Sequence, residues 1–252
     1  MDEKPKVYAF IPSRIGSERF RSKPLALIKG KPMIQHVYER ASKAPQIHDI
    51  FVATDHHEIA RVVESFGGKA ILTQETHKCG TDRINEAADI VGLSPDDIVI
   101  NIQGDQPAFH PSALEHLVAP FSNSSQVLMT TLSFPINDPR LLEDPNVVKV
   151  VVDNLGFALY FSRSPIPFKR APNSSFQYMK HLGFYAYRRS FLKTFANLPE
   201  GKLESTEKLE QLRALENGFK ILVIKSPYDS PEVDVPSDLI RVEKYLEDIS
   251  LG

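Results

Sequence analysis

FIPSRIGSERFRSKPLALIKGKPMIQHV, residues 10–37, is the stretch of the chain that decides the predicted fold. An apolar run over 7–11 breaks at Pro12 into a loop that contains serine and glycine. Between Ser13 and Lys31 this loop carries six basic residues against one acid, although the whole chain has a formal net charge of −2. Ligands of α/β proteins lie beyond the carboxyl ends of parallel strands, and arginine and lysine commonly hold phosphate oxygens. The segment therefore predicts a strand, a loop that binds a polyanion, and a helix.

The rest of the first half alternates apolar runs with amphipathic stretches. Strands are expected at 7–11, 50–53, 70–72 and 98–102, and helices are expected to begin at Pro32, at Asp55 and at Thr81 or Asp82. Asp55 and Glu58 form a D-x-x-E capping box, and Gly67-Gly68 ends that helix. This order predicts a mostly parallel sheet with right-handed crossovers.

The second half reads as longer strands separated by turns rich in proline and asparagine. They are expected at 127–134, 147–152, 157–162 and 177–187. Residues 163–176, RSPIPFKRAPNSSF, contain three prolines and no periodicity, which predicts an exposed arm. A helix from 205 or 206 to 217, a strand at 221–224 and a final helix from Pro236 should follow. No repeat or linker divides the chain, so 1–252 is predicted to be one domain.

Composition is that of an ordinary soluble globular protein. The chain has 252 residues, 42% of them hydrophobic and 25% charged. Its one cysteine, Cys79, excludes an internal disulfide, and no Cys/His metal spacing is present. The N-terminus lacks the apolar core of a signal peptide, and no window approaches 18 consecutive apolar residues. We therefore expect a cytoplasmic protein without membrane insertion, and the charge balance gives no support for nucleic-acid binding.

Two aspartates stand out as candidate metal ligands. Asp105 directly follows the strand expected at 98–102, where a carboxylate points into the ligand crevice and can hold Mg²⁺ together with phosphate oxygens. Turn formation is the alternative for this Gly-Asp-Gln-Pro sequence. Asp234 is the second candidate: Pro236 at the first helical position makes Val235 the N-cap and leaves Asp238 to satisfy the helix terminus. Asp234 then has no evident structural role, which favours a role in binding a metal.

Eight further segments, like residues 10–37, resemble one known protein family. The chain resembles the sugar nucleotidyltransferases, in particular the CMP-KDO synthetases, which are 3-deoxy-manno-octulosonate (KDO) cytidylyltransferases. The segments are VATDHHEIARVVESFGGKAILT at 52–73, HKCGTDRINEA at 77–87, VINIQGDQP at 99–107, NVVKVVVD at 146–153, ALYFSRSPIPF at 158–168, KHLGFYAYR at 180–188, EKLEQLRALENG at 207–218 and VDVPSDL at 233–239. They follow the family's order and span nearly the whole chain.

This resemblance implies a fold and an assembly. The fold is an α/β, Rossmann-like nucleotidyltransferase with a mixed, mainly parallel central sheet and helices on both faces. A smaller antiparallel sheet with an arm would serve dimerisation, as the family forms homodimers. Residues of about 145–190 would be a sub-region for sugar binding and dimer contact.

The resemblance also implies the residues of the site. Asp105 and Asp234 would bind Mg²⁺, and with Lys23 they would be the catalytic residues. Nucleotide contacts would come from Arg14, Ser17, Arg19, Lys23, Thr73, Gly80 and Gln103. The sugar acid would be bound by Arg83, Gln103, His181, Tyr185, Glu210 and Gln211. Arg83 suits a carboxylate because its planar fork gives two parallel hydrogen bonds.

Three positions depart from the family pattern. Arg21-Ser22 stands where Pro-Gly is usual, which reduces the freedom of the loop backbone. Cys79 stands where serine is common. Gln106 replaces an acid that often follows the metal-binding aspartate, so the metal site has one less negative neighbour.

The function implied is transfer of a cytidylyl group from CTP to KDO, giving CMP-KDO and diphosphate for lipopolysaccharide biosynthesis. An alternative acceptor is 8-amino-3,8-dideoxy-KDO or another sugar acid, a choice that Gln106 and residues 231–234 could tune. A non-catalytic nucleotide sensor is a different class, which the presence of both candidate metal aspartates disfavours. An NAD-dependent dehydrogenase is a third, disfavoured because the first turn lacks G-x-G-x-x-G.

Overall fold

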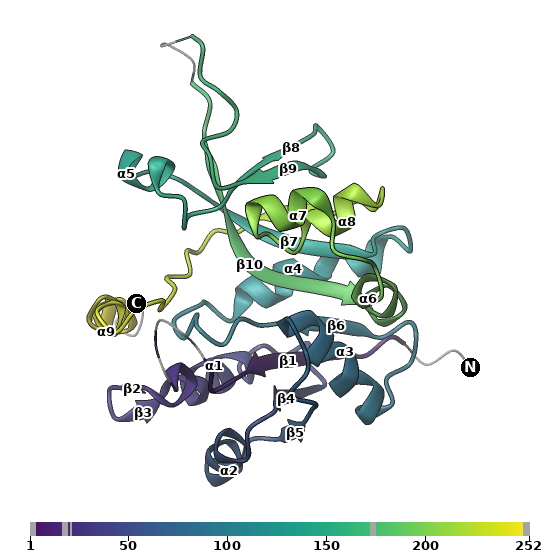
Figure 1. The fold of residues 1–252 in the computed structure, drawn as a ribbon, viewed down its shortest axis with the longest axis vertical. Coiled ribbons are helices and arrows are strands. Elements are labelled where there is room, and N and C mark those ends of the chain that lie inside the picture. The colour runs from purple at the N-terminus through teal and green to yellow at the C-terminus, as the bar shows by residue number, and fades with distance from the viewer. Residues whose placement is uncertain (1–3, 17–19, 21, 172–174, 249–252) are drawn as a thin grey trace.

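In the part of the chain that the structure describes, a mixed sheet of nine strands forms the centre of the protein (Figure 1). The computed structural model describes residues 4–16, 20, 22–171 and 175–248. Within them, the main path of the sheet runs β11 (Leu222–Lys225), β7 (Met129–Pro135), β10 (Met179–Arg188), β6 (Ile98–Asn101), β1 (Val7–Ser13), β4 (Asp49–Thr54) and β5 (Ala70–Leu72). The strands β1, β4, β5 and β6 pair in parallel, whereas β10 is antiparallel to both of its neighbours. The predicted fold class is confirmed.

Helices cover both faces of this sheet, because successive residues of the buried strands point to opposite sides. Ala9 and Ile11 pack in one core cluster with helices α1 (Met33–Ala41), α2 (His57–Ser65) and α4 (Ser112–Asn123). Phe10 packs in a second cluster with α3 (Gly80–Val91) and α6 (Arg189–Ala196). In the described part of the chain, no helix is both long enough and apolar enough to cross a membrane.

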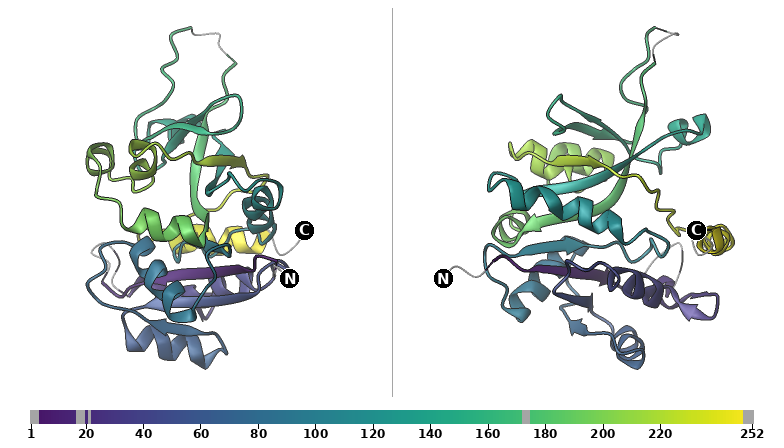
Figure 2. Two further views of the ribbon diagram at one scale, coloured as in Figure 1. Left: turned by 90° about the vertical axis from the view of Figure 1, so that its right-hand side faces the viewer. Right: turned by 180° about the vertical axis from the view of Figure 1, so that it is seen from behind.

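The antiparallel part of the structure extends from the start of β10. There, β8 (Lys149–Val152) pairs with Met179 and Lys180, and β9 (Ala158–Ser162) pairs with β8. The described residues of the 163–176 arm project beyond these strands, away from the rest of the molecule in every view (Figures 1 and 2). Helix α5 (Pro139–Glu143) lies beside them.

Two helices of the first half begin at other residues than the sequence predicted. Helix α2 is capped by His56, whose Nδ1 accepts the Glu58 amide at 3.3 Å. Asp55, the predicted cap, instead accepts a bond from Arg83 at 2.6 Å, a charged partner that binds a carboxylate more strongly than a backbone amide does. Helix α3 starts at Gly80, before Thr81, because the extended Cys79 caps it.

The helix predicted over 205–217 is two short helices, α7 (Lys202–Glu207) and α8 (Leu212–Glu216). Lys208, at φ 54°, breaks the helical path between them. The break allows Arg213 to form two hydrogen bonds to Glu204, at 2.6 and 2.8 Å. A continuous helix would set these residues about 13 Å apart along its axis. The buried ion pair therefore overrides the helical periodicity.

The last helix, α9 (Asp238–Asp248), begins two residues after the predicted Pro236. Asp238 accepts the backbone amides of Asp234 and Val235, at 2.8 and 3.0 Å, so this carboxylate satisfies the helix terminus as predicted. Val233 and α9 residues Val242 and Leu246 pack in a third cluster with Met33, which attaches the end of the chain to the beginning.

Helices α4, α5 and α6 were not predicted. Pro120 lies inside α4, a residue that normally argues against a helix interior. Helix α6 follows β10 directly, because Arg188 ends the strand and Arg189 begins the helix. No Gly or Pro marks that boundary in the sequence, so nothing in the sequence indicated where the strand ends and the helix begins.

The basic loop returns to the sheet through a tight hairpin of β2 (Leu27–Ile28) and β3 (Lys31–Pro32). Its two central residues, Lys29 and Gly30, both have positive φ, as a type I′ turn requires. Ser22, at a position where the resemblance implies glycine, also has a positive φ of 55°. A residue with a Cβ atom is strained in this conformation by roughly 1–2 kcal/mol.

Ser22→Gly should therefore raise the free energy of unfolding by up to about 1 kcal/mol, because glycine adopts the left-handed conformation without strain. The measurement is urea unfolding of both proteins. Gly30→Ala is the matched control. Gly30 has a φ of 77° and open space around its Cβ position, so the added methyl group causes backbone strain but no clash, and the substitution should be destabilising. A Ser22→Gly protein less stable than the parent would contradict the assignment of strain.

Candidate active site

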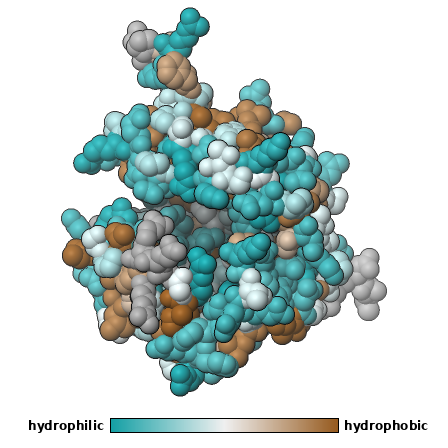
Figure 3. Space-filling view, in the orientation of Figure 1, coloured by the Kyte–Doolittle hydropathy of each residue, from teal (hydrophilic) through white to brown (hydrophobic). Residues whose placement is uncertain are grey.

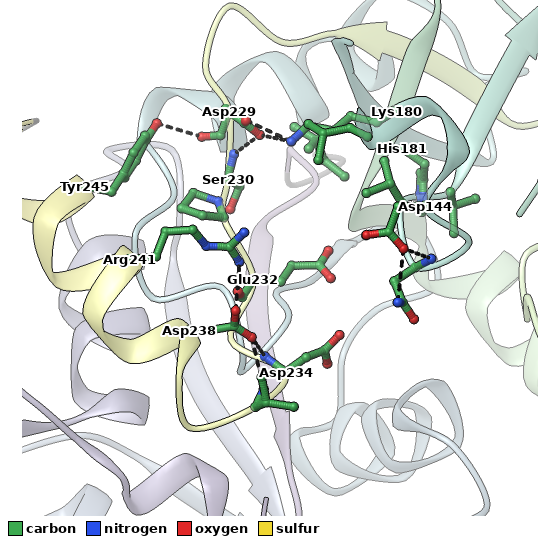
Figure 4. A pocket seen from close by; sticks show the side chains of 18 of the residues that line it. Asp144, Lys180, His181, Asp229, Ser230, Glu232, Asp234, Asp238, Arg241 and Tyr245 are labelled. Atoms are coloured by element: carbon green, nitrogen blue, oxygen red, sulfur yellow. Dashed lines mark hydrogen bonds and ion pairs between the residues drawn. The ribbon is translucent and has the colours of Figure 1, made fainter. Parts of the chain in front are cut away.

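Two cavities meet at the carboxyl ends of the parallel strands, and Asp234 lines both. The first cavity, of about 430 Å³, is lined by Arg14, Lys23, Gly80, Arg83, Gln103 and Asp105, among others. The second, of about 840 Å³, is lined by His181, Lys180, Asp229 and Glu232, among others (Figure 4). On the surface, the molecule is hollowed between the part that carries α5 and the part that carries α1, and hydrophilic residues border the hollow (Figure 3).

The Lys23 ammonium group stands where the two cavities meet. Its Nζ lies 2.8 Å from Asp105 Oδ2 and 3.8 Å from Asp234 Oδ1, and it donates a hydrogen bond to the Val233 carbonyl oxygen at 2.9 Å. The Val233 amide in turn donates to the Asp105 carbonyl oxygen at 2.8 Å. The fold thus brings together the three residues predicted to be catalytic, from segments that are far apart in the sequence.

The two aspartates fit the magnesium site that the sequence predicts. Both present carboxylate oxygens to one cation, and Mg²⁺ prefers oxygen ligands from one or two carboxylates together with phosphate oxygens. Within the described residues, no group of three or more His, Cys, Asp or Glu side chains is placed to hold a metal. A metal bound by Asp105 and Asp234 would therefore draw its remaining ligands from substrate and water.

Predicted nucleotide contacts gather around the first cavity. Arg14, Gly80 and Gln103 line it together with Lys23. A Cβ atom at Gly80 would approach the Pro12 ring to 3.1 Å, so glycine lets the start of α3 lie close to the loop after β1. Ser17 and Arg19 lie outside the described residues. Thr73 is buried behind Arg83, from which its Oγ1 accepts a bond at 2.5 Å.

Arg83 does not line the same cavity as His181, with which it was predicted to bind the sugar acid. It lines the first cavity, whereas His181, its predicted companion at the sugar acid, lines the second. Its guanidinium group is buried and already donates to Asp55 at 2.6 Å and to Thr73. The geometry favours a positioning role for Arg83 over the predicted direct contact with a sugar carboxylate.

His181 presents a hydrogen-bond acceptor at the second cavity. Thr131 donates its hydroxyl proton to the Phe184 carbonyl oxygen at 2.7 Å, so it accepts from His181 Nε2–H at 2.9 Å. Burial lowers the pKa of His181 to about 3, and its ring packs against Phe161 and Tyr185. The ring is therefore neutral with the proton on Nε2, and Nδ1 is left to accept a hydrogen bond.

Of the remaining predicted sugar contacts, Tyr185 and Gln211 are buried, whereas Glu210 and Gln103 are half-buried. Burial raises the pKa of Tyr185 well above its usual value. Glu210 accepts bonds from Cys79 Sγ at 3.0 Å and Thr81 Oγ1 at 2.9 Å, and burial raises its pKa. Gln211 is buried, and its Nε2 has no hydrogen-bond partner in the described structure. Gln103 links the two cavities, because it lines the first and donates to the carbonyl oxygen of Gly183, which lines the second, at 2.9 Å.

Sequence reasoning did not place Lys180 or Asp229 in the site, and it named Glu232 only within residues 231–234, which with Gln106 could tune the choice of acceptor. Lys180 pairs with Asp229 at 2.6 Å, next to His181 on β10. Glu232 accepts a bond from Gln106 Nε2 at 2.8 Å. Burial, and then the Asp105 and Asp234 carboxylates, raise the pKa of Glu232 to about 8. The sequence did not predict the hydrogen bond between Gln106 and Glu232, which the fold shows.

The pKa of His181 predicts a pH dependence of stability. Because the unfolded state binds a proton near pH 6.5 and the folded state does so only near pH 3, stability falls as the pH falls through that window. Between pH 7 and pH 5 this residue should cost about 2 kcal/mol, a loss that His181→Gln should remove. Urea unfolding at the two pH values measures it, with exposed His116→Gln as the control. Equal losses in the parent and in His181→Gln would contradict the assignment.

Comparison with known proteins identifies the family. The family model described as "Cytidylyltransferase" matches residues 8–221. A 3-deoxy-manno-octulosonate cytidylyltransferase of Desulfatibacillum aliphaticivorans is 52% identical over 96% of this chain and 99% of its own length. An 8-amino-3,8-dideoxy-manno-octulosonate cytidylyltransferase of Shewanella pealeana is 56% identical over 92% of this chain and 95% of its own.

Solved structures agree with these relatives. A CMP:2-keto-3-deoxy-manno-octonic acid synthetase complexed with CTP superimposes with a TM-score of 0.90 at 41% identity, covering 97% of this chain and 99% of that one. A 4-diphosphocytidyl-2C-methyl-D-erythritol synthase of Anaerococcus prevotii, 14% identical with a TM-score of 0.65 over 97% and 100% of the two chains, shares the fold. The chain is a member of the cytidylyltransferase family.

Proposed function

We propose that the chain transfers a cytidylyl group from CTP to a KDO-type sugar acid, giving the CMP-sugar acid and diphosphate for lipopolysaccharide biosynthesis. The observation that carries this proposal is the junction of two cavities at Lys23, Asp105 and Asp234, the first lined by Arg14 and Lys23 and the second by His181. Relatives named for this activity and a structural neighbour that contains CTP support it.

The reaction is one displacement at phosphorus. The anomeric hydroxyl oxygen attacks the α-phosphorus of CTP, the bond to the bridging oxygen of the β-phosphate breaks, diphosphate leaves, and the hydroxyl proton passes to solvent. Catalysis of such a step consists mainly of positioning and charge stabilisation. A junction between two substrate cavities supplies the positioning, because it presents the two reacting groups to each other.

Side chains of the first cavity meet the triphosphate. Lys23 and Arg14 would neutralise charge that develops on the departing diphosphate, and Lys23 leaves its contact with Asp105 to do so. In the second cavity, His181 Nδ1 accepts a hydrogen bond from a sugar hydroxyl and orients the ring. Mg²⁺ held by Asp105 and Asp234 would polarise the α-phosphate and lower the pKa of the attacking hydroxyl.

Release of diphosphate from each nucleoside triphosphate, with and without KDO, tests the proposed function. Only CTP together with KDO should release diphosphate at an enzymatic rate. Release that does not depend on the sugar acid, or that is equal for all nucleotides, would reject it. Nucleotide binding without any release would instead support the alternative of a nucleotide sensor.

Asp105→Asn and Asp234→Asn should each lower kcat on the order of 10²–10³-fold, because each removes a charge that stabilises the transition state. Both variants should remain folded, with a thermal unfolding temperature close to that of the parent protein. Asp96→Asn, at an exposed carboxylate, is the matched control and should be fully active. Full activity of the parent enzyme in excess chelator would refute the requirement for a divalent cation.

The proposal places the protein in the cytoplasm, because CTP is a cytoplasmic substrate. It also includes a homodimer, which the exposed apolar side chains support. The antiparallel extension and the arm expose large apolar side chains: Val152, Leu155, Leu159, Phe168 and Phe176. Phe168 is 87% exposed and Leu159 63% exposed. Several large exposed apolar side chains on one projecting part of a molecule are typical of an interaction site, and a second copy of the chain would cover them.

Light scattering at micromolar concentration should give about twice the 28.4 kDa of one chain. Leu159→Glu combined with Phe168→Glu should give the mass of a single chain, because buried charges without partners oppose association. Leu27→Glu is the control: Leu27 is similarly exposed, at 61%, but lies on the β2–β3 hairpin far from the arm, and this variant should remain a dimer. A parent protein of 28.4 kDa would refute the dimer.

A further inference from the structure

Two basic side chains, Lys149 and Arg163, hold three segments of the chain together at the wall of the second cavity. Lys149 of β8 is fully buried, at 0% exposed. Its ammonium group donates hydrogen bonds to the carbonyl oxygen of Asp144, at 3.0 Å, and to that of Arg163. The Arg163 guanidinium group donates to the carbonyl oxygens of Pro145, at 2.8 Å, and of Glu207, at 2.6 Å. The segment after α5, the end of β9 and the end of α7 are thereby joined.

The Glu207 carboxylate makes the same connection from the side of α7. Its Oε1 accepts the Ser162 hydroxyl proton at 2.7 Å, and its Oε2 accepts the Arg163 backbone amide at 3.0 Å. Arg163 also donates to the carbonyl oxygen of Lys208, where the helical path breaks, at 3.3 Å. Because most of these bonds end on backbone atoms, they fix the positions of the segments relative to one another.

The segment after α5 forms part of the second cavity, and Arg163 lines that cavity too. Four of the residues 144–148 line it: Asp144, Asn146, Val147 and Val148. The Val148 carbonyl oxygen accepts the His181 backbone amide at 2.8 Å, so this wall is attached to the strand that carries His181. The described residues that line the first cavity come from other segments. The two basic side chains are thus linked to one cavity and not to the other.

Arg188 shows the same chemistry at another place in the fold. Its guanidinium group donates to the carbonyl oxygens of Val127 and Phe121, each at 3.1 Å, and of Ser124, at 3.0 Å. It is the last residue of β10 and is not among the described residues that line either cavity. Loss of Arg188 would leave carbonyl oxygens without a donor and so lower stability, as loss of Arg163 would. A purely structural role predicts the same consequences for both arginines.

We propose that Lys149 and Arg163 are positioning residues for the sugar acid, because they hold residues 144–148 where this segment forms a wall of the acceptor cavity. The inference rests on the proposed function, which assigns the acceptor to the second cavity. Without the two cations, the carbonyl oxygens of residues 144 and 145 lose their donors and are satisfied only by turning toward water. The acceptor must then order this segment when it binds, which weakens the binding of the acceptor but not that of CTP.

Steady-state kinetics, with KDO and CTP varied in turn, test the inference. Lys149→Met and Arg163→Met each replace a cation by an unbranched neutral side chain. Each should raise the KM for KDO roughly tenfold, the effect expected for lost hydrogen bonds from a charged group. The kcat and the KM for CTP should stay close to those of the parent, because other segments line the first cavity. Arg163→Lys keeps the charge and should recover part of the loss.

Arg188→Met is the matched control. It should lower the stability to urea as Arg163→Met does, and it should change neither KM. If Arg163→Met loses stability in the same way but keeps the KM of the parent for KDO, the cation serves stability alone and the inference is overturned. An equal rise in both KM values overturns it as well.

These outcomes are distinct from a failure of the proposed function. A parent protein that releases no diphosphate with CTP and KDO rejects the proposed function, and the inference fails with it. Should the methionine variants not fold, Arg163→Lys decides: a smaller rise in the KM for KDO alone supports the inference, and an unchanged KM contradicts it.

Discussion

The Lys23 ammonium group holds the candidate site together. It contacts Asp105, which follows β6, and both Asp234 and the Val233 carbonyl oxygen, which precede α9. Two carboxylates this close repel one another unless a cation lies between them. The lysine supplies that cation in the free protein, and a metal ion with a nucleotide triphosphate would supply it during the reaction.

Such an exchange of cations would link the proposed metal site to the basic loop. Lys23 belongs to the loop that follows β1, so any event that draws its ammonium group toward phosphate also uncovers Asp105 for a metal. The loop, the end of β6 and the start of α9 are far apart in the sequence but share one charge cluster. The apolar contacts of Val233 with Met33 and α9 hold the backbone of the cluster in place, so the side chains can rearrange without loss of the fold.

The fold was predictable from the sequence where periodicity and turn chemistry agree. The parallel strands of the first half follow from short apolar runs that alternate with amphipathic stretches. The boundaries were wrong where a tertiary ion pair decides them: Asp55 binds Arg83 and so does not cap α2, and Glu204 binds Arg213 across the break between α7 and α8.

The two acids of the candidate site stood out in the sequence by their positions after a strand and before a helix, whereas the role of Lys23 within the basic loop was assigned by resemblance. Glu232 was named only as part of residues 231–234, without a contact or a direction for its side chain. Asp234 follows two residues further along the same irregular segment, and the direction of a side chain in such a segment is set by tertiary contacts such as the bond from Gln106. Arg83 was placed by resemblance, and its pairing with Asp55 depends on the packing of α3 against β4.

A structure of the protein with CTP and Mg²⁺ tests the central claim most directly. The account predicts the triphosphate in the first cavity, with the α-phosphate beside Asp105 and Asp234. Lys23 Nζ should have left Asp105 for a phosphate oxygen, while the second cavity stays open beside His181. A nucleotide seated in the second cavity, or phosphates bound while Lys23 keeps its 2.8 Å contact with Asp105, would contradict the account.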